Sequence, residues 1–221
     1  NKVPNEQPFM ATSCCPAWSV MAKKLFPDFK PYISMALTPM VLTGRLIKKQ
    51  KPDAKVVFIG PCAAKKLEAS RKSVRSDIDF VLTFEEVMGM FEAKGIDLPQ
   101  VEADTPFDEA SANGRGFAVS GGVANAVKQC IQKKHPEKEV LIDSAEGLKN
   151  CRTMLMMAKA GKRNGYLLEG MACPGGCVAG AGTLQPVIKS SALVKKYTND
   201  AEKKLAFESE YLDNLDLLTK E

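Results

Sequence analysis

The sequence predicts an α/β fold in which mostly parallel strands are flanked by helices. Short apolar runs rich in β-branched residues alternate along the chain with longer segments of helical periodicity. Cysteine-containing segments directly follow two of these runs, at the place where an open parallel sheet gathers its ligands. The runs expected as strands are residues 55–59, 78–82, 139–142 and 166–169.

Most of the expected helices carry a start or stop signal. Thr38 is a suitable N-cap and is followed by Pro39, which is favoured at the first helical position. Thr83 and Glu86 form the pattern of a capping box, and Gly161 is a C-terminal stop. The expected helices are residues 16–26, 38–50, 83–93, 120–133 and 148–160, with a polar helical tail after residue 186.

The domain organisation follows from the length and from the tail. A chain of 221 residues is long enough for one large domain or two small lobes with a real core. We expect residues 1–186 to form one domain and residues 187–221 to be a helical extension. Within the domain we expect two lobes of mostly parallel sheet flanked by helices, with the functional site between the lobes.

The composition argues against several classes of protein. With 45% hydrophobic and 26% charged residues, the chain is ordinary for a soluble globular protein. No stretch approaches the roughly 20 apolar residues that a membrane span requires, and the sequence starts without a secretory pattern, so we expect a cytoplasmic protein. The net charge of +5 is spread over lysines without interleaved aromatic residues, so no nucleic-acid partner is expected.

Five of the seven cysteines fall in three short segments that contain glycine or proline. Thiolates in such segments favour a metal or catalytic site over disulfides. Their spacing is awkward for the paired knuckles of structural zinc and is natural for an iron–sulfur cluster, although zinc and buried structural thiols remain alternatives. The four candidate ligands are Cys15, Cys62, Cys173 and Cys177, with Cys14 beside the first.

Other residues of potential interest are interpreted as structural. Cys130 and Cys151 lie within expected helices and are interpreted as core thiols. His135 is the one histidine of the sequence and precedes a proline in a charged turn, where we expect it to be exposed. Trp18 has two interpretations, as a wall of the cysteine site or as packing for the first helix.

The cysteine segments resemble a known family. Thr-Ser-Cys-Cys-Pro-Ala-Trp at 12–18, Pro-Cys-Ala-Ala-Lys-Lys-Leu-Glu at 61–68 and Met-Ala-Cys-Pro-Gly-Gly-Cys at 171–177 are similar to the signature segments of the catalytic domain of iron-only (FeFe) hydrogenases. They stand in the same order as in the family, and the segments 76–83 and 118–123 are also family-like. The resemblance covers roughly residues 9–186.

The resemblance implies an H-cluster, which is a 4Fe-4S cubane bridged through one cysteine to a di-iron subcluster with CO, cyanide and azadithiolate ligands. By motif position, Cys15, Cys62 and Cys173 would bind the cubane, and Cys177 would bridge to the di-iron subcluster. Cys14 would relay protons to the bridging amine. The implied activity is reversible H2 oxidation and proton reduction, with ferredoxin or upstream iron–sulfur domains as electron partner and with maturation proteins that assemble the cofactor.

Further site residues follow from the same motifs. Lys65 would donate a hydrogen bond to a cyanide ligand, as a compact ammonium can. Glu68 and Ser34 match positions of a proton path. The residues expected to contact the cofactor, besides Lys65, are Met171, Gly60, Pro61 and Ala172.

The chain departs from the family pattern at several positions. Gly60 and Ala17 stand where catalytic members usually carry Met and Gly, and the run after Cys177 lacks the usual consecutive glycines. Such departures imply a slow hydrogenase used for H2 sensing. The string at 65–71 is similar to the eukaryotic Narf-like cluster-assembly proteins, so a cluster-binding protein without hydrogenase activity is the alternative. We also expect a missing N-terminal part of the catalytic domain, upstream or on a separate chain.

Overall fold

The computed structural model describes residues 3–102 and 109–218, and it places two small parallel sheets within one α/β arrangement. In the first sheet β5 lies between β1 and β4, and in the second β2 pairs with β3. All these pairs are parallel, which confirms the predicted fold class. The strands are β1 (Met10–Ala11), β2 (Val57–Gly60), β3 (Phe80–Thr83), β4 (Leu141–Glu146) and β5 (Tyr166–Met171).

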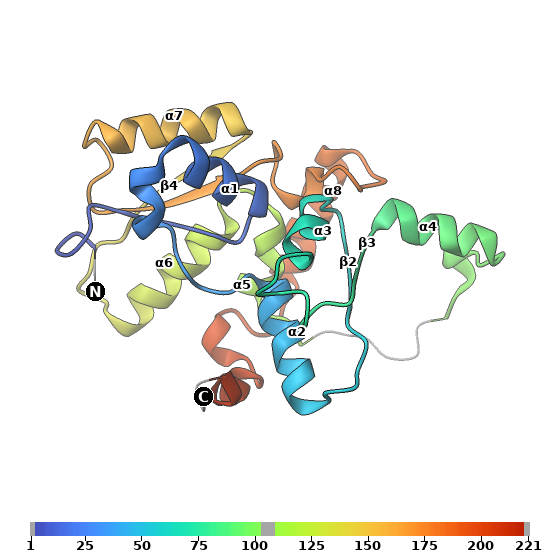
Figure 1. The fold of residues 1–221 in the computed structure, drawn as a ribbon. Coiled ribbons are helices and arrows are strands. Elements are labelled where there is room, and N and C mark those ends of the chain that lie inside the picture. Colours follow the sequence, from blue (N-terminus) through green and yellow to red (C-terminus); the bar gives the residue numbers. More distant parts are fainter. Residues whose placement is uncertain (1–2, 103–108, 219–221) are drawn as a thin grey trace.

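Helices cover both faces of the first sheet. Figure 1 shows α7 and α6 on opposite sides of β4, and α1 packs against α7 and β5. The helices are α1 (Pro16–Leu25), α2 (Pro39–Gln50), α3 (Ala64–Ala69), α4 (Phe84–Ala93), α5 (Ala112–Arg115), α6 (Gly122–Lys134), α7 (Leu148–Lys159) and α8 (Val187–Asn199). Short 3-10 turns join them: η1 (Pro27–Tyr32), η2 (Leu98–Gln100), η3 (Gly116–Ala118), η4 (Cys177–Ala179), η5 (Ala206–Glu208) and η6 (Leu212–Leu218). No helix in the described parts of the chain has the length and apolar character needed to cross a membrane.

The predicted caps are confirmed. Thr38 accepts a hydrogen bond from the backbone N–H of Val41 at the start of α2. At the start of α4, the Thr83 hydroxyl accepts from the Glu86 N–H at 3.2 Å, and the Glu86 carboxylate accepts from the Thr83 N–H at 2.8 Å. These reciprocal bonds satisfy donors that a helix start leaves without partners.

β1 and α3 are among the elements that the local sequence does not predict. β1 is two residues long and exists as a strand because it pairs with β5, Met10 opposite Leu167 and Ala11 opposite Leu168. The six-residue α3 follows the Cys62 loop. β4 and β5 both end later than the predicted strands 139–142 and 166–169, because the two strands pair in register as far as Glu146 and Met171. No helix or strand was predicted within residues 97–118; part of this range lies outside the described residues, and the remainder contains η2, α5 and η3.

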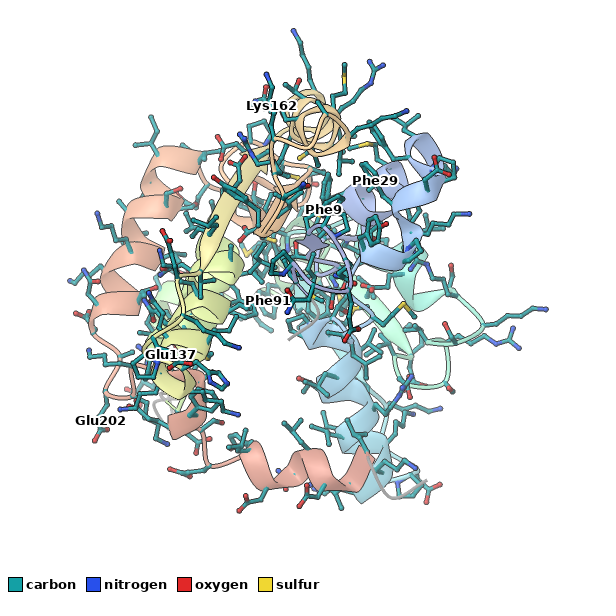
Figure 2. The ribbon with its side chains drawn as sticks, turned by 90° about the vertical axis from the view of Figure 1, so that its left-hand side faces the viewer. Phe9, Phe29, Phe91, Glu137, Lys162 and Glu202 are labelled. Carbon is teal, nitrogen blue, oxygen red and sulfur yellow. The ribbon has the colours of Figure 1, made fainter. Side chains whose placement is uncertain are left out.

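Each sheet has its own hydrophobic core. The first core packs α1 and α7 against β1 and β5, and Phe9 meets Phe29 there edge to face, with ring centroids 5.0 Å apart (Figure 2). Trp18 is fully buried in this core, and its indole N–H donates to the Thr12 carbonyl at 3.0 Å. A Cβ at Gly170 would lie 2.2 Å from the Trp18 ring, so the helix and the strand meet in direct contact. Trp18 therefore packs the first helix.

The C-terminal part of the chain is helical, as predicted. α8 packs on α5, where Arg115 donates to the Tyr197 carbonyl at 2.9 Å and its guanidinium lies 3.9 Å from the centre of the Tyr197 ring. Beyond α8, η6 reaches α2 (Figure 2). The tail therefore packs against elements of the domain, and the division of the chain at residue 186 stays a prediction.

Candidate functional site

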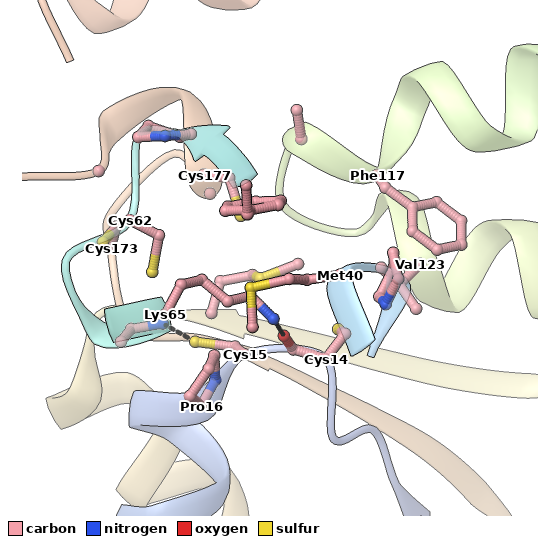
Figure 3. A pocket seen from close by; sticks show the side chains of 18 of the residues that line it. Cys14, Cys15, Pro16, Met40, Cys62, Lys65, Phe117, Val123, Cys173 and Cys177 are labelled. Atoms are coloured by element: carbon pink, nitrogen blue, oxygen red, sulfur yellow. Dashed lines mark hydrogen bonds between the residues drawn. The ribbon is translucent and has the colours of Figure 1, made fainter. Parts of the chain in front are cut away.

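A cavity of about 260 Å³ lies between the two sheets, and five cysteines form part of its wall. These are the predicted cysteines Cys14, Cys15, Cys62, Cys173 and Cys177. Figure 3 shows Cys15, Cys62, Cys173 and Cys177 towards one end of the cavity and Phe117 and Val123 at the other. The structure therefore brings together three cysteine segments that are far apart in the sequence.

The fold explains why these segments meet. Cys62 lies two residues beyond β2, Cys173 lies two residues beyond β5, and Cys15 is the N-cap residue of α1, shortly after β1. All three therefore follow the carboxyl end of a parallel strand. In open α/β sheets this edge gathers ligands, because the loops that leave neighbouring strands converge there.

Close approach of the backbone fixes the turn that carries the last two cysteines. Gly176 has φ of +92°, and a Cβ there would lie 2.6 Å from the Ser120 nitrogen. A Cβ at Gly180 would lie 2.3 Å from the Pro61 carbonyl oxygen, on the loop that carries Cys62. A side chain at either position would push the cysteine segments apart.

Burial and neighbouring thiols raise the pKa values of two of the candidate ligands. Burial, followed by the nearby Cys15 and Cys62, raises the pKa of Cys177 to about 12. Burial and the same two neighbours also raise the pKa of Cys173. Thiolates crowded in this way repel one another unless a positive metal centre neutralises them, and metal binding takes up the thiolate form.

The four candidate ligands are thiolates, and four cysteine thiolates are the usual ligand set of an iron–sulfur cubane. Within residues 3–102 and 109–218, the structure contains no group of three His, Cys, Asp or Glu side chains placed to hold a single metal ion. The four predicted ligands instead share the wall of one cavity. The ligands of a cubane bind different iron atoms and are therefore spread apart, whereas a structural zinc ion draws its four ligands to one point.

Cys14 occupies a different part of the wall from Cys15. Figure 3 shows the two side chains pointing in different directions, with Cys15 on the side of Cys62. Burial, with smaller contributions from the Glu169 charge and Cys15, raises the pKa of Cys14 to about 11. The Cys14 thiol thus keeps its proton at neutral pH in this environment.

Lys65 and Glu68 form a buried ion pair on α3. The Lys65 ammonium donates to the Glu68 carboxylate at 2.6 Å and to the Cys14 carbonyl at 3.4 Å. Their side chains are 10% and 6% exposed, so the pair is shielded from water. Glu68 therefore orients Lys65, which lines the cavity, and does not line it itself.

The two residues of the predicted proton path, Ser34 and Glu68, each make a local hydrogen bond. Ser34 does not line the cavity, and its hydroxyl accepts a hydrogen bond from the Ala36 N–H at 3.1 Å. Glu68 is bonded to Lys65. The route through Ser34 and Glu68 stays a prediction.

A family comparison agrees with this geometry. The model of the family described as "Iron only hydrogenase large subunit, C-terminal domain" matches residues 1–181. The chain belongs to the iron-only hydrogenase family. Proteins that contain this domain include both hydrogenases and cluster-assembly proteins.

Curated relatives of both kinds are similarly distant. The periplasmic [Fe] hydrogenase large subunit of Nitratidesulfovibrio vulgaris is 32% identical over 80% of this chain and 51% of its own length. Iron hydrogenase 1 of Clostridium pasteurianum is 30% identical over 88% of this chain and 41% of its own. Cytosolic iron-sulfur assembly component 3 of Rattus norvegicus is 32% identical over 80% of this chain and 47% of its own length. The chain thus spans about half the length of these relatives.

Solved structures agree on the fold. A variant of the [FeFe]-hydrogenase HydA1 from Chlamydomonas reinhardtii superposes with a TM-score of 0.71 at 22% identity. The match covers 95% of this chain and 71% of that chain. The iron-only hydrogenase fold therefore accounts for nearly all of the chain.

Gly60 is one of the positions at which the sequence departs from the family pattern, and the side chain of a neighbouring residue occupies the space beside it. Gly60 does not line the cavity, whereas Phe58, two residues earlier, does. A Cβ at Gly60 would lie 2.8 Å from the Phe58 ring. The Phe58 ring thus supplies apolar bulk next to the position where Gly60 has no side chain. The other expected wall residues, Met171, Ala172 and Pro61, do line the cavity.

Introducing methionine at position 60 should therefore be tolerated poorly unless the ring is removed. We expect Gly60→Met to destabilise the chain by about 1–3 kcal/mol, the usual range for overpacking. Combining it with Phe58→Ala should recover part of that loss, measured as a favourable coupling in a double-mutant cycle by urea unfolding. Additive effects of the two substitutions would contradict the proposed overlap of the two side chains.

Several wall residues were not singled out by the sequence analysis. They come from α2, α5, η3 and α6, and they include Met40, Arg115, Phe117, Ala118 and Val123. The signal that could have found part of this set was the family-like segment 118–123. The others have no local signature, because their role depends on how the two sheets face each other.

The cysteines outside the cavity differ from each other. Cys151 is fully buried, as predicted, and its thiol donates to the Ala145 and Met171 carbonyls at 3.3 and 3.5 Å. Cys130 is half-buried and so is less enclosed than expected. His135 is exposed, as predicted.

Proposed function

We propose that this chain binds an H-cluster and, as part of a hydrogenase, interconverts H2 with protons and electrons. The observation that carries the proposal is that the cavity extends beyond the cysteines. One end gathers the four cysteines that a cubane requires, and the space continues towards Phe117 and Val123, where no further ligand is needed for a cubane. Cys14 and Lys65 also line this cavity, so a proton carrier and a cation face the additional space.

The residues fit the two parts of the cofactor. Cys15, Cys62 and Cys173 would hold the cubane, and Cys177 would hold both the cubane and the di-iron subcluster. Ala172 donates its backbone N–H to the Cys15 sulfur at 3.5 Å, the kind of contact that tunes such a cluster. Apolar side chains, among them Met40 and Phe58, line the rest of the cavity.

When bound, the di-iron subcluster with its CO, cyanide and azadithiolate ligands supplies the open metal position and the base at which H2 is split. The chain itself contributes a proton donor and acceptor, the Cys14 thiol. Lys65, held by Glu68, presents a fixed ammonium donor suited to an anionic ligand such as cyanide. Both groups act in a cavity with a mainly apolar wall, where charged groups interact more strongly than in bulk water.

The remaining elements of the proposal concern partners and rate. The substrates are H2 and protons, and electrons would pass to ferredoxin or to other iron–sulfur domains. Maturation proteins would supply the di-iron subcluster in an anaerobic, cytoplasmic setting. The departures at Gly60 and Ala17 support a slow, H2-sensing member of the family.

A second candidate function follows from the relatives. The cytosolic assembly components are as similar to this chain as the hydrogenases are. A cluster-assembly protein of the Narf-like type would use Cys15, Cys62, Cys173 and Cys177 for a cubane and carry no di-iron subcluster. On that alternative, Cys14 and Lys65 have no partner in the cofactor.

Infrared spectroscopy separates the two functions. After anaerobic reconstitution with iron and sulfide and loading with the di-iron subcluster, a hydrogenase should show bands of metal-bound CO and cyanide and should evolve H2 from a low-potential reductant. A cubane signal by electron paramagnetic resonance without those bands, and without H2, would contradict the hydrogenase proposal and favour the assembly function. Protein without bound iron and sulfide would contradict both.

A further inference from the structure

Glu146 connects the end of β4 to the turn that carries Cys173 and Cys177. It is the last residue of β4 and lies opposite Met171, the last residue of β5. Its carboxylate accepts a hydrogen bond of 3.0 Å from the backbone N–H of Gly175, midway between the two cysteines. A charged side chain thus touches the backbone of the proposed cluster-binding segment.

The backbone on both sides of this contact is fixed. The Gly147 N–H donates to the Met171 carbonyl at 2.9 Å, and the Asn150 amide donates to the Glu146 carbonyl at 3.0 Å. Within the turn, the Gly176 N–H donates to the Cys173 carbonyl at 3.0 Å. Backbone hydrogen bonds therefore flank the contact of the carboxylate on both sides.

Gly175 has a backbone conformation that makes an external anchor important. Its φ is +95°, and that of the next residue, Gly176, is +92°. Two successive glycines in this region have large conformational freedom, so a free turn would sample many positions of the flanking sulfurs. Besides Glu146, the Ser120 N–H holds the turn, by donating to the Gly175 carbonyl at 3.3 Å.

We propose that Glu146 is a positioning residue that fixes the Cys173–Cys177 turn and lowers the reduction potential of the iron–sulfur cluster bound there. The proposal rests on the proposed cluster, and it holds for a cubane with or without a di-iron subcluster. Two physical effects act in the same direction. A nearby negative charge disfavours the addition of an electron, and a backbone N–H that donates to Glu146 does not donate to a cluster sulfur, where it would favour the reduced state.

The test is a redox titration of the full chain, reconstituted with iron and sulfide and monitored by electron paramagnetic resonance. Glu146→Gln keeps an oxygen acceptor for the Gly175 N–H and removes the charge, so it should bind iron as the wild type does and titrate at a more positive potential. Glu146→Ala also frees the N–H and should titrate at least as positively, with a larger loss of iron to a chelator. Only the electrostatic role moves the potential in the Gln variant, because the anchor is retained.

Glu139→Gln is the matched control. Glu139 is exposed and lies just before the start of β4, at the end of the strand opposite to Glu146. The substitution therefore removes the same charge at a place far from the cysteines. The reduction potential of the cluster in Glu139→Gln should equal that in the wild type. An unchanged potential in Glu146→Gln, or an equal shift in the control, would overturn the inference while the cluster remains established. Failure of the wild type to bind iron and sulfide would instead contradict the proposed function, and the inference with it.

Discussion

Replacing Cys14 with alanine should abolish H2 turnover while the iron–sulfur cluster remains in place. Cys14 lines the cavity but points in a different direction from Cys15, so it is not needed to complete a set of four ligands. Its thiol is the side chain proposed to carry the proton, and removal of a positioned proton carrier typically slows a reaction by about 100-fold or more. Reductant-driven H2 evolution, measured with iron content and the cubane signal on the same sample, checks the result.

Cys15→Ala provides the comparison within the same pair. Cys15 lies near Cys62, Cys173 and Cys177, and Ala172 donates to its sulfur. Its removal should therefore reduce the content of iron and sulfide as well as activity. If Cys14→Ala loses the cubane and Cys15→Ala keeps it, the roles of the two neighbouring cysteines have been exchanged.

Glu169→Ala should have the largest effect on folding stability. Glu169 is fully buried on β5, and its carboxylate accepts from the backbone N–H groups of Gly121 and Ala124 at 2.8 and 2.6 Å. These donors belong to the start of α6, where unpaired N–H groups and the helix dipole favour an anion. We expect a loss of about 3 kcal/mol or more, because each buried donor left without an acceptor costs about 1–3 kcal/mol.

Urea unfolding of the chain measures this loss, and two further variants define its cause. Glu169→Gln keeps one acceptor oxygen and should fall between the wild type and the alanine variant. Burial raises the pKa of Glu169 despite its N–H partners, so removing the charge offsets part of the lost bonding in the glutamine variant. Glu92→Ala, at an exposed position of α4, should change stability little. Equal stability of all variants would show that α6 does not depend on this anchor.

Local patterns predicted the regular elements well. The caps at Thr38 and Thr83 identified the starts of α2 and α4, because a capping bond joins residues only three apart. The β-branched run before Cys62 identified β2 for a similar reason. β1 could not be found in this way, since two residues become a strand only by pairing with β5.

The same limit applies to the site. The motifs named the cysteines, and the strand ends explained why these should converge. No motif could show that Phe58 fills the space beside Gly60, because that depends on the rotamer of a neighbouring side chain. Nor could a motif show that Glu68 forms a buried pair with Lys65, which lines the cavity, because the burial of the pair is set by the packing of α3.

The sequence by itself determined the α/β class, the helix caps and the three cysteine segments, because each is recorded in residues that are close along the chain. The tertiary structure decided which side chains share the cavity wall, how Cys14 and Cys15 divide it, and which acids anchor the surrounding backbone. Glu146 and Glu169 illustrate the difference, since their partners lie 29 and 45–48 residues away. Hydrogen bonds across such separations form only when the sheet has brought the segments together, so no local pattern contains them.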